Sequence, residues 1–490
     1  MKSLALNLLT ALLLLSQATL NAADGGKQKP NIIVILADDL GYGDLGCFGA
    51  KDIRTPNLDK MAAEGLKLTS FYAQPICGPS RAALMTGCYP LRIGEVKNGK
   101  SGHTLPHTKE VFIAEMLRDA GYRTGIVGKW HLGMSAGCDP MAQGFQHGYF
   151  TPAFNGATRD IQPGAVVPFM RRPGEVVRTI KTKADMDTLT ADCTREALEF
   201  IRASKGAPFF LYVAYHMPHV PLGVSAMFRG KSKRGLYGDT IEELDSAIGD
   251  VFTQLKALGL DDNTLVVFTS DNGPWTDKQI GDHGGSPLPF RGGKMTTWEG
   301  GWRVPGIMRW PGKVRAGETS DGIASTIDLL PTFAALSGAK LPEAQLDGLD
   351  LTNFLTQPNA PSPRDTFLYH NGARLTAVRH KDFKLVFARP AGGEMPYMPG
   401  FVTSHIEALP AQQLYQLSDD PTESTDISSK HPDVTKLINA IATKSRADLG
   451  DHTGPGSGAR LFDEGPRWPI PQAAKVGTPG RKAKAKTTKQ

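Results

Sequence analysis

The strongest constraint on the fold is a set of four short, largely apolar runs that alternate with helical patterns. A run without polar alternation indicates a strand buried on both faces, as in a parallel sheet covered by helices. The runs are residues 31–36, 124–127, 208–214 and 265–268. Helical patterns between them include residues 188–204 and 240–258. This alternation predicts an α/β fold with a mostly parallel sheet and helices on both faces.

Polar side chains follow each of these runs at its carboxyl end. They are Asp38 and Asp39, Lys129 and His131, His216 and His219, and Asp271 and Asn272. The carboxyl ends of parallel strands meet at one edge of a sheet, where open α/β sheets bind ligands, so a common site is predicted there. Carboxylate and amide oxygens suit Ca²⁺ or Mg²⁺. With Arg81, Lys129 and Lys294 as cations, such a pocket favours a sulfate or phosphate ester.

Cys77 begins the segment Cys77-Gly78-Pro79-Ser80-Arg81, which is predicted as a turn entering a helix. Pro79 suits the first helical turn, because its missing N–H would have no partner there, and Gly87 can end the helix. A helix N-terminus favours negative charge, and Arg81 follows four residues later. We therefore expect an unusually acidic thiol and a place that suits an oxyanion. A buried structural cysteine ahead of a helix is the other interpretation, and it is the favoured one when this cysteine is considered in isolation.

The sequence pattern changes after Pro361-Ser362-Pro363. Short alternating segments at 373–379, 383–387 and 413–417 predict antiparallel strands. We therefore expect a larger, site-bearing domain at residues 30–360 and a smaller subdomain at residues 361–470. The stretches 151–183, 217–238 and 273–294 are expected to be loops that set specificity around the site.

The two ends of the chain are expected to lie outside these domains. Lys2, the apolar run 4–15 and the small residues up to Ala22 are typical of a secretory signal peptide, residues 1–22. The mature chain is therefore expected to be exported, to the periplasm or beyond the cell, and no later apolar run is long enough for a transmembrane segment.

The formal net charge of +6 comes from one end of the chain. Residues 473–490 contain six basic residues and no acid, which predicts a basic, disordered tail at 471–490. No interleaved aromatic and basic pattern indicates a nucleic-acid partner. The five cysteines include no CxxC pair, which argues against a thiolate metal cage.

Several motifs together resemble one enzyme family. Cys77-Gly78-Pro79-Ser80-Arg81 resembles the Cys-x-Pro-Ser-Arg signature of the sulfatases, and the segment 128–133 resembles their second signature. The resemblance continues through residues 37–41, 270–273, 293–294 and 299–301 in the family's order. It implies a formylglycine-dependent, arylsulfatase-like enzyme with an alkaline-phosphatase-like α/β fold and a smaller C-terminal domain carrying an antiparallel sheet.

The resemblance implies an unusual nucleophile at Cys77. In the family, a formylglycine-generating maturation enzyme oxidises this cysteine to formylglycine (3-oxoalanine). One hydroxyl of the hydrated aldehyde attacks sulfur and expels the alcohol. The sulfate hemiacetal that remains collapses by elimination and regenerates the aldehyde, whereas a serine would be left as a stable sulfate ester.

A single Ca²⁺ is also implied by the resemblance. Its ligands would be Asp38, Asp39, Asp271 and Asn272, with the modified Cys77 side chain beside the metal. Asp271 would in addition take a proton from the attacking hydroxyl.

The resemblance assigns the remaining polar groups to sulfate and proton transfer. Arg81 and Lys129 would hold and polarise the formylglycine, and His131 would be the base of the elimination step. His219 and Lys294 would bind sulfate oxygens and assist the leaving group. Such groups each contribute on the order of 10²–10⁴-fold in rate.

Two alternatives to a sulfatase stay open at this point. One is a phosphomonoester or phosphonate monoester hydrolase on the same scaffold, and the other is a non-catalytic relative that binds sulfated glycans. For a sulfatase, a sulfated polysaccharide is the preferred substrate over a small aryl sulfate, because an exported enzyme meets polymers.

Overall fold

A large mixed sheet forms the centre of the computed structural model, which describes residues 28–94, 110–134, 137–153, 166–276, 283–389 and 408–460. The strand order is β10-β2-β9-β8-β1-β7-β3-β4-β5-β6, and β11 also pairs with β2. Its central strands are β8 (Thr264–Ser270), β1 (Asn31–Ala37), β7 (Phe209–Ala214) and β3 (Arg123–Lys129). They are mutually parallel and coincide with the four apolar runs, so the predicted parallel core is confirmed.

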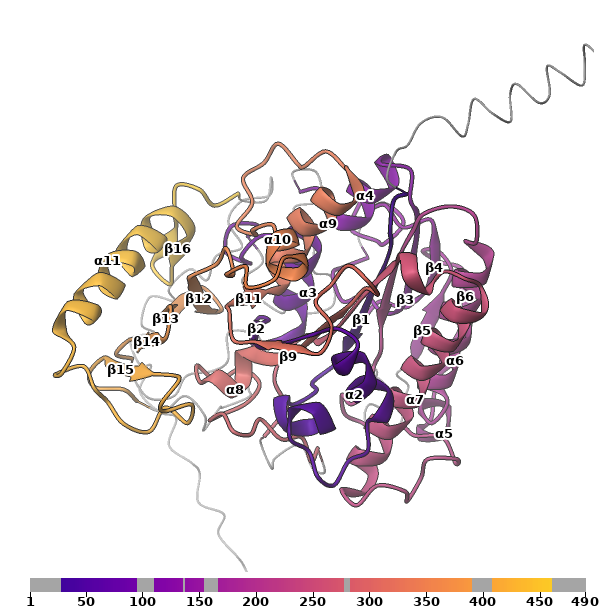
Figure 1. Ribbon diagram of the computed structural model, residues 1–490, viewed down its shortest axis with the longest axis horizontal. Helices are drawn as coiled ribbons and strands as arrows, with labels where there is room; N and C mark the ends of the chain where they lie inside the picture. The colour runs from indigo at the N-terminus through magenta and orange to yellow at the C-terminus, as the bar shows by residue number, and fades with distance from the viewer. Residues whose placement is uncertain are drawn as a thin grey trace, which may run out of the picture.

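Helices cover both faces of this sheet, and β1 shows why its run is apolar throughout. Ile32 and Val34 pack into one layer, whereas Ile33 and Ile35 pack into the other. The first layer is formed by α3 (Cys77–Thr86), α4 (Ile113–Asp119), α9 (Leu329–Ser337) and α10 (Thr352–Thr356). The second is formed by α2 (Pro56–Ala63), α5 (Lys183–Met186), α6 (Leu189–Ala203) and α7 (Gly235–Ala257) (Figure 1).

The sheet loses its parallel order away from the centre. On one side β9 (Arg303–Arg309) runs antiparallel between β8 and β2 (Leu66–Tyr72). The short strands β10 (Glu318–Ser320) and β11 (Ala324–Ser325) then pair parallel to β2.

On the other side β4 (His147–Thr151) is parallel to β3, and β5 (Val167–Met170) and β6 (Val176–Ile180) are antiparallel. The expectation of a loop throughout residues 151–183 is therefore wrong, because Phe169 and Ile180 are buried in the second layer. The expected loop 217–238 likewise ends early, since α7 begins at Gly235.

A second, antiparallel sheet follows, as predicted. Its strands are β12 (Thr366–Asn371), β13 (Arg374–His380), β14 (Phe383–Val386) and β15 (Gln413–Gln416). Helix α11 (Pro432–Leu449) packs on it through Ile438 and Ala442, and the ribbon β16 (Gly450–Asp451) and β17 (Gly454–Pro455) follows (Figure 1). Strand β12 and helix α11 were not predicted from the sequence.

The short helix α8 (Glu299–Trp302) joins the two sheets through a buried carboxylate. Glu299 accepts hydrogen bonds of 2.6 Å from the hydroxyls of Tyr72 on β2 and Tyr369 on β12. Lys384 on β14 donates to the same carboxylate over 2.9 Å and lies 2.7 Å from Glu423. We call Glu299, Lys384, Glu423 and the two tyrosines the junction cluster.

Some expectations lie outside the described residues. These are the signal peptide at 1–22, the basic tail at 471–490 and the end of the subdomain at 461–470. The boundary between residues 360 and 361 stays a prediction. Within the described residues, no helix has both the length and the apolar character needed to cross a membrane.

Candidate active site

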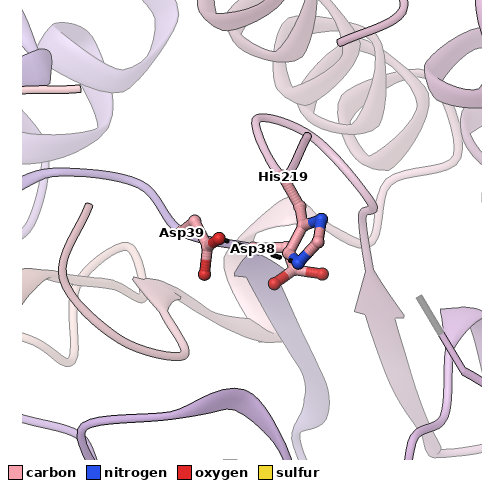
Figure 2. A group of neighbouring side chains, drawn as sticks. All are labelled: Asp38, Asp39 and His219. Carbon is pink, nitrogen blue, oxygen red and sulfur yellow. Dashed lines mark ion pairs between the residues drawn. The ribbon is translucent and has the colours of Figure 1, made fainter. Parts of the chain in front are cut away.

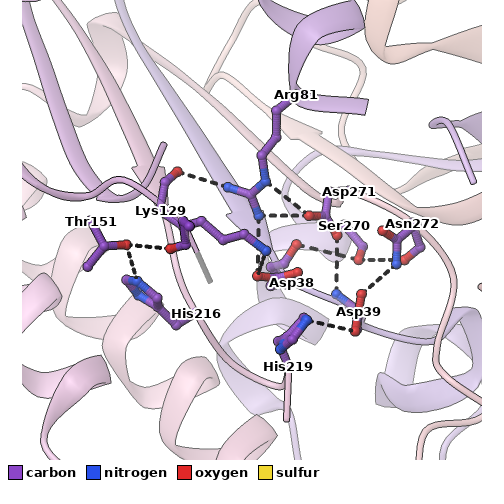
Figure 3. A network of polar contacts seen from close by, with 12 residues as sticks. Asp38, Asp39, Arg81, Lys129, Thr151, His216, His219, Ser270, Asp271 and Asn272 are labelled. Atoms are coloured by element: carbon purple, nitrogen blue, oxygen red, sulfur yellow. Dashed lines mark hydrogen bonds and ion pairs between the residues drawn. The ribbon is translucent and has the colours of Figure 1, made fainter. Parts of the chain in front are cut away.

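The four strand exits lie together, because β8, β1, β7 and β3 are neighbours that run in one direction. Figure 3 shows side chains from all four exits around one space, with Arg81 of α3 reaching in from above. Asp38, Asp39 and Asn272 are fully buried, and Asp271 is 1% exposed. Charges at this depth need partners, since an unpaired buried charge is costly.

Asp38 is paired with two cations. The Lys129 ammonium donates to its Oδ2 over 2.6 Å, and an Arg81 guanidinium nitrogen lies 3.6 Å from the same oxygen. Burial raises the pKa of Asp38, but the charges of Lys129, His219 and Arg81 outweigh it and hold the pKa well below its ordinary value. Asp38 is therefore a carboxylate.

Asp39 contacts the other side of the site. Its Oδ1 accepts from Lys294 over 2.5 Å and from Asn272 over 2.7 Å, and its Oδ2 lies 3.8 Å from His219 Nε2. Figure 2 shows the two aspartates and His219 facing one another. The backbone φ of Asp39 is 67°, in the left-handed region, which Asp adopts more readily than most residues. This backbone turn directly follows β1.

Arg81 joins the exits of two strands. Its Nε and Nη2 donate to Asp271 Oδ2 over 3.1 and 2.7 Å, and its Nη1 donates to the Lys129 carbonyl over 2.9 Å. Burial, with the charge of Asp38, raises the pKa of Asp271 to about 6 in spite of Arg81. Asp271 Oδ1 accepts from the backbone N–H of Asp39 over 3.2 Å, so both its oxygens are engaged.

Cys77 occupies the first position of α3, and Gly87 ends that helix in the left-handed conformation with φ 68°, as predicted. The expected acidic thiol is wrong, however. Cys77 is 3% exposed, and burial raises the pKa of its thiol, which outweighs the nearby charges of Lys129 and Lys294. The lost hydration of a thiolate, together with the charges of Asp38 and Asp271, therefore outweighs the two lysines.

Three side-chain oxygens of the site have no hydrogen-bond donor among the described residues. They are Oδ1 of Asp38, Oδ2 of Asp39 and Oδ1 of Asn272, and all three are buried. A buried acceptor without a donor costs about 1–3 kcal/mol, so such a set needs another partner. Hard cations such as Ca²⁺ take carboxylate and amide oxygens of this kind. The donor set therefore fits the predicted metal.

A nitrogen also lies close to these oxygens. Ligand atoms of Asp38, Asp39 and His219 lie within 4.8 Å of one another. Imidazole nitrogen suits transition metals better than Ca²⁺, so the three oxygens are the better match for a hard cation.

The three predicted histidines differ in their contacts. His216 Nε2 lies 2.8 Å from the Thr151 hydroxyl of β4, and burial lowers the pKa of His216 to about 3. His219 Nδ1 lies 2.5 Å from the Val220 carbonyl, and burial lowers the pKa of His219 to about 4 in spite of the aspartates. The backbone φ of His131 is 63°, and its backbone N–H donates to the Pro152 carbonyl over 3.0 Å. His216 therefore braces β4, whereas His219 lies against Asp39.

Two residues near the site were missed from the sequence. Tyr212, inside the apolar β7 run, places its hydroxyl 3.4 Å from Arg81 Nη1. His283 is 2% exposed, with its ring 4.9 Å from the Tyr237 ring, and burial lowers its pKa to about 4 against the charge of Asp39. The two glycines that follow, Gly284 and Gly285, could have indicated a tightly packed place near His283. A Cβ at Gly285 would lie 2.9 Å from the His283 ring.

Comparison with known proteins identifies the family of this chain. A family model described as Sulfatase matches residues 30–339, and one described as the C-terminal region of aryl-sulfatase matches residues 362–453. N-acetylgalactosamine-6-sulfatase of Canis lupus familiaris is 40% identical over 472 residues, which cover 89% of this chain and 90% of the relative.

Solved structures give the same result. PsFucS1 sulfatase from Pseudoalteromonas sp. superposes with a TM-score of 0.75 at 32% identity, covering 88% of this chain and 92% of that one. Ps i-CgsB in complex with k-i-k-neocarrahexaose superposes with a TM-score of 0.71 at 33% identity, covering 85% and 92%. With its parallel core, antiparallel C-terminal sheet and the matches above, this chain has the alkaline-phosphatase-like fold and belongs to the sulfatase family of sulfuric ester hydrolases.

Proposed function

We propose that this protein is an exported sulfatase that hydrolyses a sulfate monoester of a carbohydrate, using a formylglycine made from Cys77 and one bound Ca²⁺. One observation carries the proposal. Three buried oxygens without a hydrogen-bond donor among the described residues lie together with three cations, Arg81, Lys129 and Lys294, near the N-terminus of α3. A pocket of this composition suits a metal together with a sulfate dianion or monoester.

The metal would be held by Asp38, Asp39 and Asn272 through these oxygens. Asp271, whose oxygens already accept from Arg81 and from the Asp39 N–H, would contribute a remaining lone pair. When bound, Ca²⁺ supplies positive charge that polarises a sulfate oxygen and the oxygen nucleophile.

The cations around the site would stabilise the negative charge on the oxygens at position 77 and on the sulfate. Lys129 and Arg81 lie on the Asp38 and Asp271 side, next to the start of α3, and would hold the oxygens at position 77. Lys294 lies on the Asp39 side and would bind a sulfate oxygen. Fixed charges in a dry site cost no reorganisation during the reaction, so each would contribute strongly.

Two histidines would move protons. His219 presents Nε2 toward Asp39 and would assist the leaving alcohol. His131, two residues after the end of β3, would take the proton from the oxygen at position 77 during elimination of sulfate. Proton transfer of this kind is worth about 10²–10⁴-fold.

A sulfated carbohydrate is the favoured substrate class. The relative from Canis lupus familiaris is named for an N-acetylgalactosamine 6-sulfate, and the second solved structure holds a neocarrahexaose. The basic residues of 473–490 would also favour a polyanionic substrate. Export would follow from the predicted signal peptide at residues 1–22.

Two measurements on protein made together with a formylglycine-generating enzyme test the proposal. The mass of the Cys77 peptide should show the loss of one sulfur and two hydrogens and the gain of one oxygen. Turnover should be faster on sulfate monoesters than on matched phosphate and phosphonate monoesters, and a Ca²⁺ chelator should abolish it. Faster turnover of phosphonates would support the alternative hydrolase, and an unmodified thiol without turnover would support a glycan-binding role.

A further inference from the structure

A cavity of about 590 Å³ lies in the C-terminal part of the molecule, apart from the strand exits. It is bounded by β13, by residues 387–389 after β14, by α11 and by the β16–β17 ribbon with the turn between its strands. Figure 1 shows these elements together on the side of the second sheet. None of its lining residues belongs to the site described above.

The charge of this cavity is mainly positive. Arg374, Arg389 and Arg446 line it, and Asp451 is the one residue with a carboxylate among its described lining residues. Asp451 is already engaged, since it lies 2.6 Å from Arg446 Nε and 3.0 Å from His452 Nδ1. An anion entering the cavity would therefore meet an excess of planar, multi-donor cations, which suit sulfate and carboxylate groups.

Aromatic packing holds two of these arginines in place. Arg446 lies over the Phe387 ring at 4.6 Å, and Arg389 lies over the Trp298 ring at 5.5 Å. Only 7% of Arg389 is exposed. Pre-positioned side chains lose less freedom on binding, so the cavity is built for a ligand group rather than lined by mobile surface chains.

Residues that contact or adjoin the arginines of the cavity also contact the loop that carries Lys294. Trp298 also stacks under Arg291 at 3.7 Å, in the loop that carries Lys294. The tight hairpin between β12 and β13 has Asn371 at one end, donating to the Met295 carbonyl over 2.6 Å, and Arg374 at the other. The hairpin thus places Arg374 in the cavity while it contacts the residue after Lys294.

We propose that this cavity is a second anion site that binds a sulfate or carboxylate group of a glycan chain whose sulfate ester occupies the active site. The proposal rests on the proposed function for the identity of the polymer. It makes the substrate an oligosaccharide with more than one negative charge, because a monosulfated small molecule could not fill both sites.

Substitutions in the cavity test this inference. The variants are Arg374→Gln and Arg446→Gln, with Arg374→Lys as a charge-preserving control. Arg118→Gln on α4 is a control for net charge, because Arg118 lies outside the cavity. The probes are a chondroitin 6-sulfate hexasaccharide and 4-nitrophenyl sulfate. Every variant keeps residues 473–490, so binding by those residues is constant.

We expect each Gln variant to raise KM for the hexasaccharide about tenfold, the loss of one charge-assisted contact, and to leave turnover of 4-nitrophenyl sulfate unchanged. Arg374→Lys should lose less, and Arg118→Gln nothing. The inference is overturned if KM for the hexasaccharide stays within about twofold in both Gln variants, or if both substrates are affected equally.

Direct binding separates this inference from the proposed function. Hexasaccharide affinity is measured by calorimetry on a Cys77→Ala background, which has no nucleophile at position 77, with inorganic sulfate as competitor, so no turnover is needed. Weaker binding in the Gln variants supports the cavity even if the protein hydrolyses neither probe. Unchanged binding excludes it even if the protein is an active sulfatase.

Discussion

Two buried ionic clusters of this protein differ in how many of their buried oxygens lack a partner. At the strand exits, Asp38, Asp39 and Asn272 keep three buried oxygens without a donor among the described residues. In the junction cluster, the Glu299 carboxylate accepts from two tyrosines and Lys384, and Glu423 accepts from the Glu299 N–H over 2.7 Å. Glu423 Oε1 also lacks a hydrogen bond among the described residues, but it lies 2.7 Å from the Lys384 ammonium. Burial and charge are common to both clusters, so what distinguishes the strand exits is a set of several buried oxygens with no donor or cation this close.

This comparison predicts opposite responses to substitution. The first cluster should lose activity before stability, because its unsatisfied oxygens are proposed to bind a ligand. The junction cluster should lose stability first, because every group in it is committed to the fold.

The largest effect is expected for Cys77→Ser. A serine retains the oxygen but lacks the aldehyde hydrate, so kcat on 4-nitrophenyl sulfate should fall by about 10⁴-fold or more. The free energy of unfolding in urea should change by less than about 1 kcal/mol. Intact-mass measurement should find one sulfate retained per chain. Turnover within tenfold of the unaltered enzyme would contradict the assignment of Cys77.

Asp39→Asn should come next. It removes the charge that faces Lys294 and the proposed metal, so turnover should fall about 10²–10⁴-fold. Ca²⁺ at a hundred times its Kd should stabilise the unaltered protein by about 2.7 kcal/mol and the variant by much less. The half-exposed Asp52, which pairs with Arg234, gives the control Asp52→Asn. Equal Ca²⁺ stabilisation in all three proteins would argue against Asp39 as a ligand.

Lys384→Met should affect stability instead. It leaves Glu299 and Glu423 buried without their shared cation, which should cost about 3–5 kcal/mol in urea unfolding. The exposed pair of Lys340 and Glu343, 3.1 Å apart, gives a matched control, and Lys340→Met should cost less than about 1 kcal/mol. A similar loss in the free energy of unfolding for the two variants would contradict a stabilising role for the junction cluster.

The smallest effect is a pH dependence at Glu423. Burial and the charge of Glu299 raise its pKa to about 7 in spite of Lys384. The folded protein then binds this proton more tightly than the unfolded chain, so the free energy of unfolding should fall as pH rises from about 4.5 to 7. Glu423→Gln cannot titrate and should flatten this fall, by at most about 3 kcal/mol. Parallel urea-unfolding curves against pH would refute the raised pKa.

The sequence was sufficient for the groups that follow the central strands. Asp38, Lys129 and Asp271 each come directly after, or at the end of, a central strand, and His219 follows β7 by five residues. Parallel pairing brings such strand ends together whatever the loops do. The strength of this prediction comes from local pattern and one rule of topology.

Contacts between distant segments were beyond such reasoning. Lys384 pairs with Glu299 across 85 residues of sequence, and no local pattern marks either as buried. The pKa of Cys77 was predicted in the wrong direction for the same reason, because burial depth is set by the whole fold. The β5–β6 hairpin was missed because its strands are short and add to the edge of the sheet.

The position of Cys77 at the start of α3, shortly after β2, also limits the time in which it can be modified during protein synthesis. The Pro75 carbonyl accepts from the Met295 N–H, the Ala73 N–H donates to the Trp302 carbonyl, and β9 pairs with β2. These partners leave the ribosome more than two hundred residues after Cys77. At roughly 5–20 residues per second, the thiol stays uncovered for about 10–50 s. Since the folded chain exposes only 3% of Cys77, the proposed oxidation competes with chain elongation, and slower translation should raise the modified fraction.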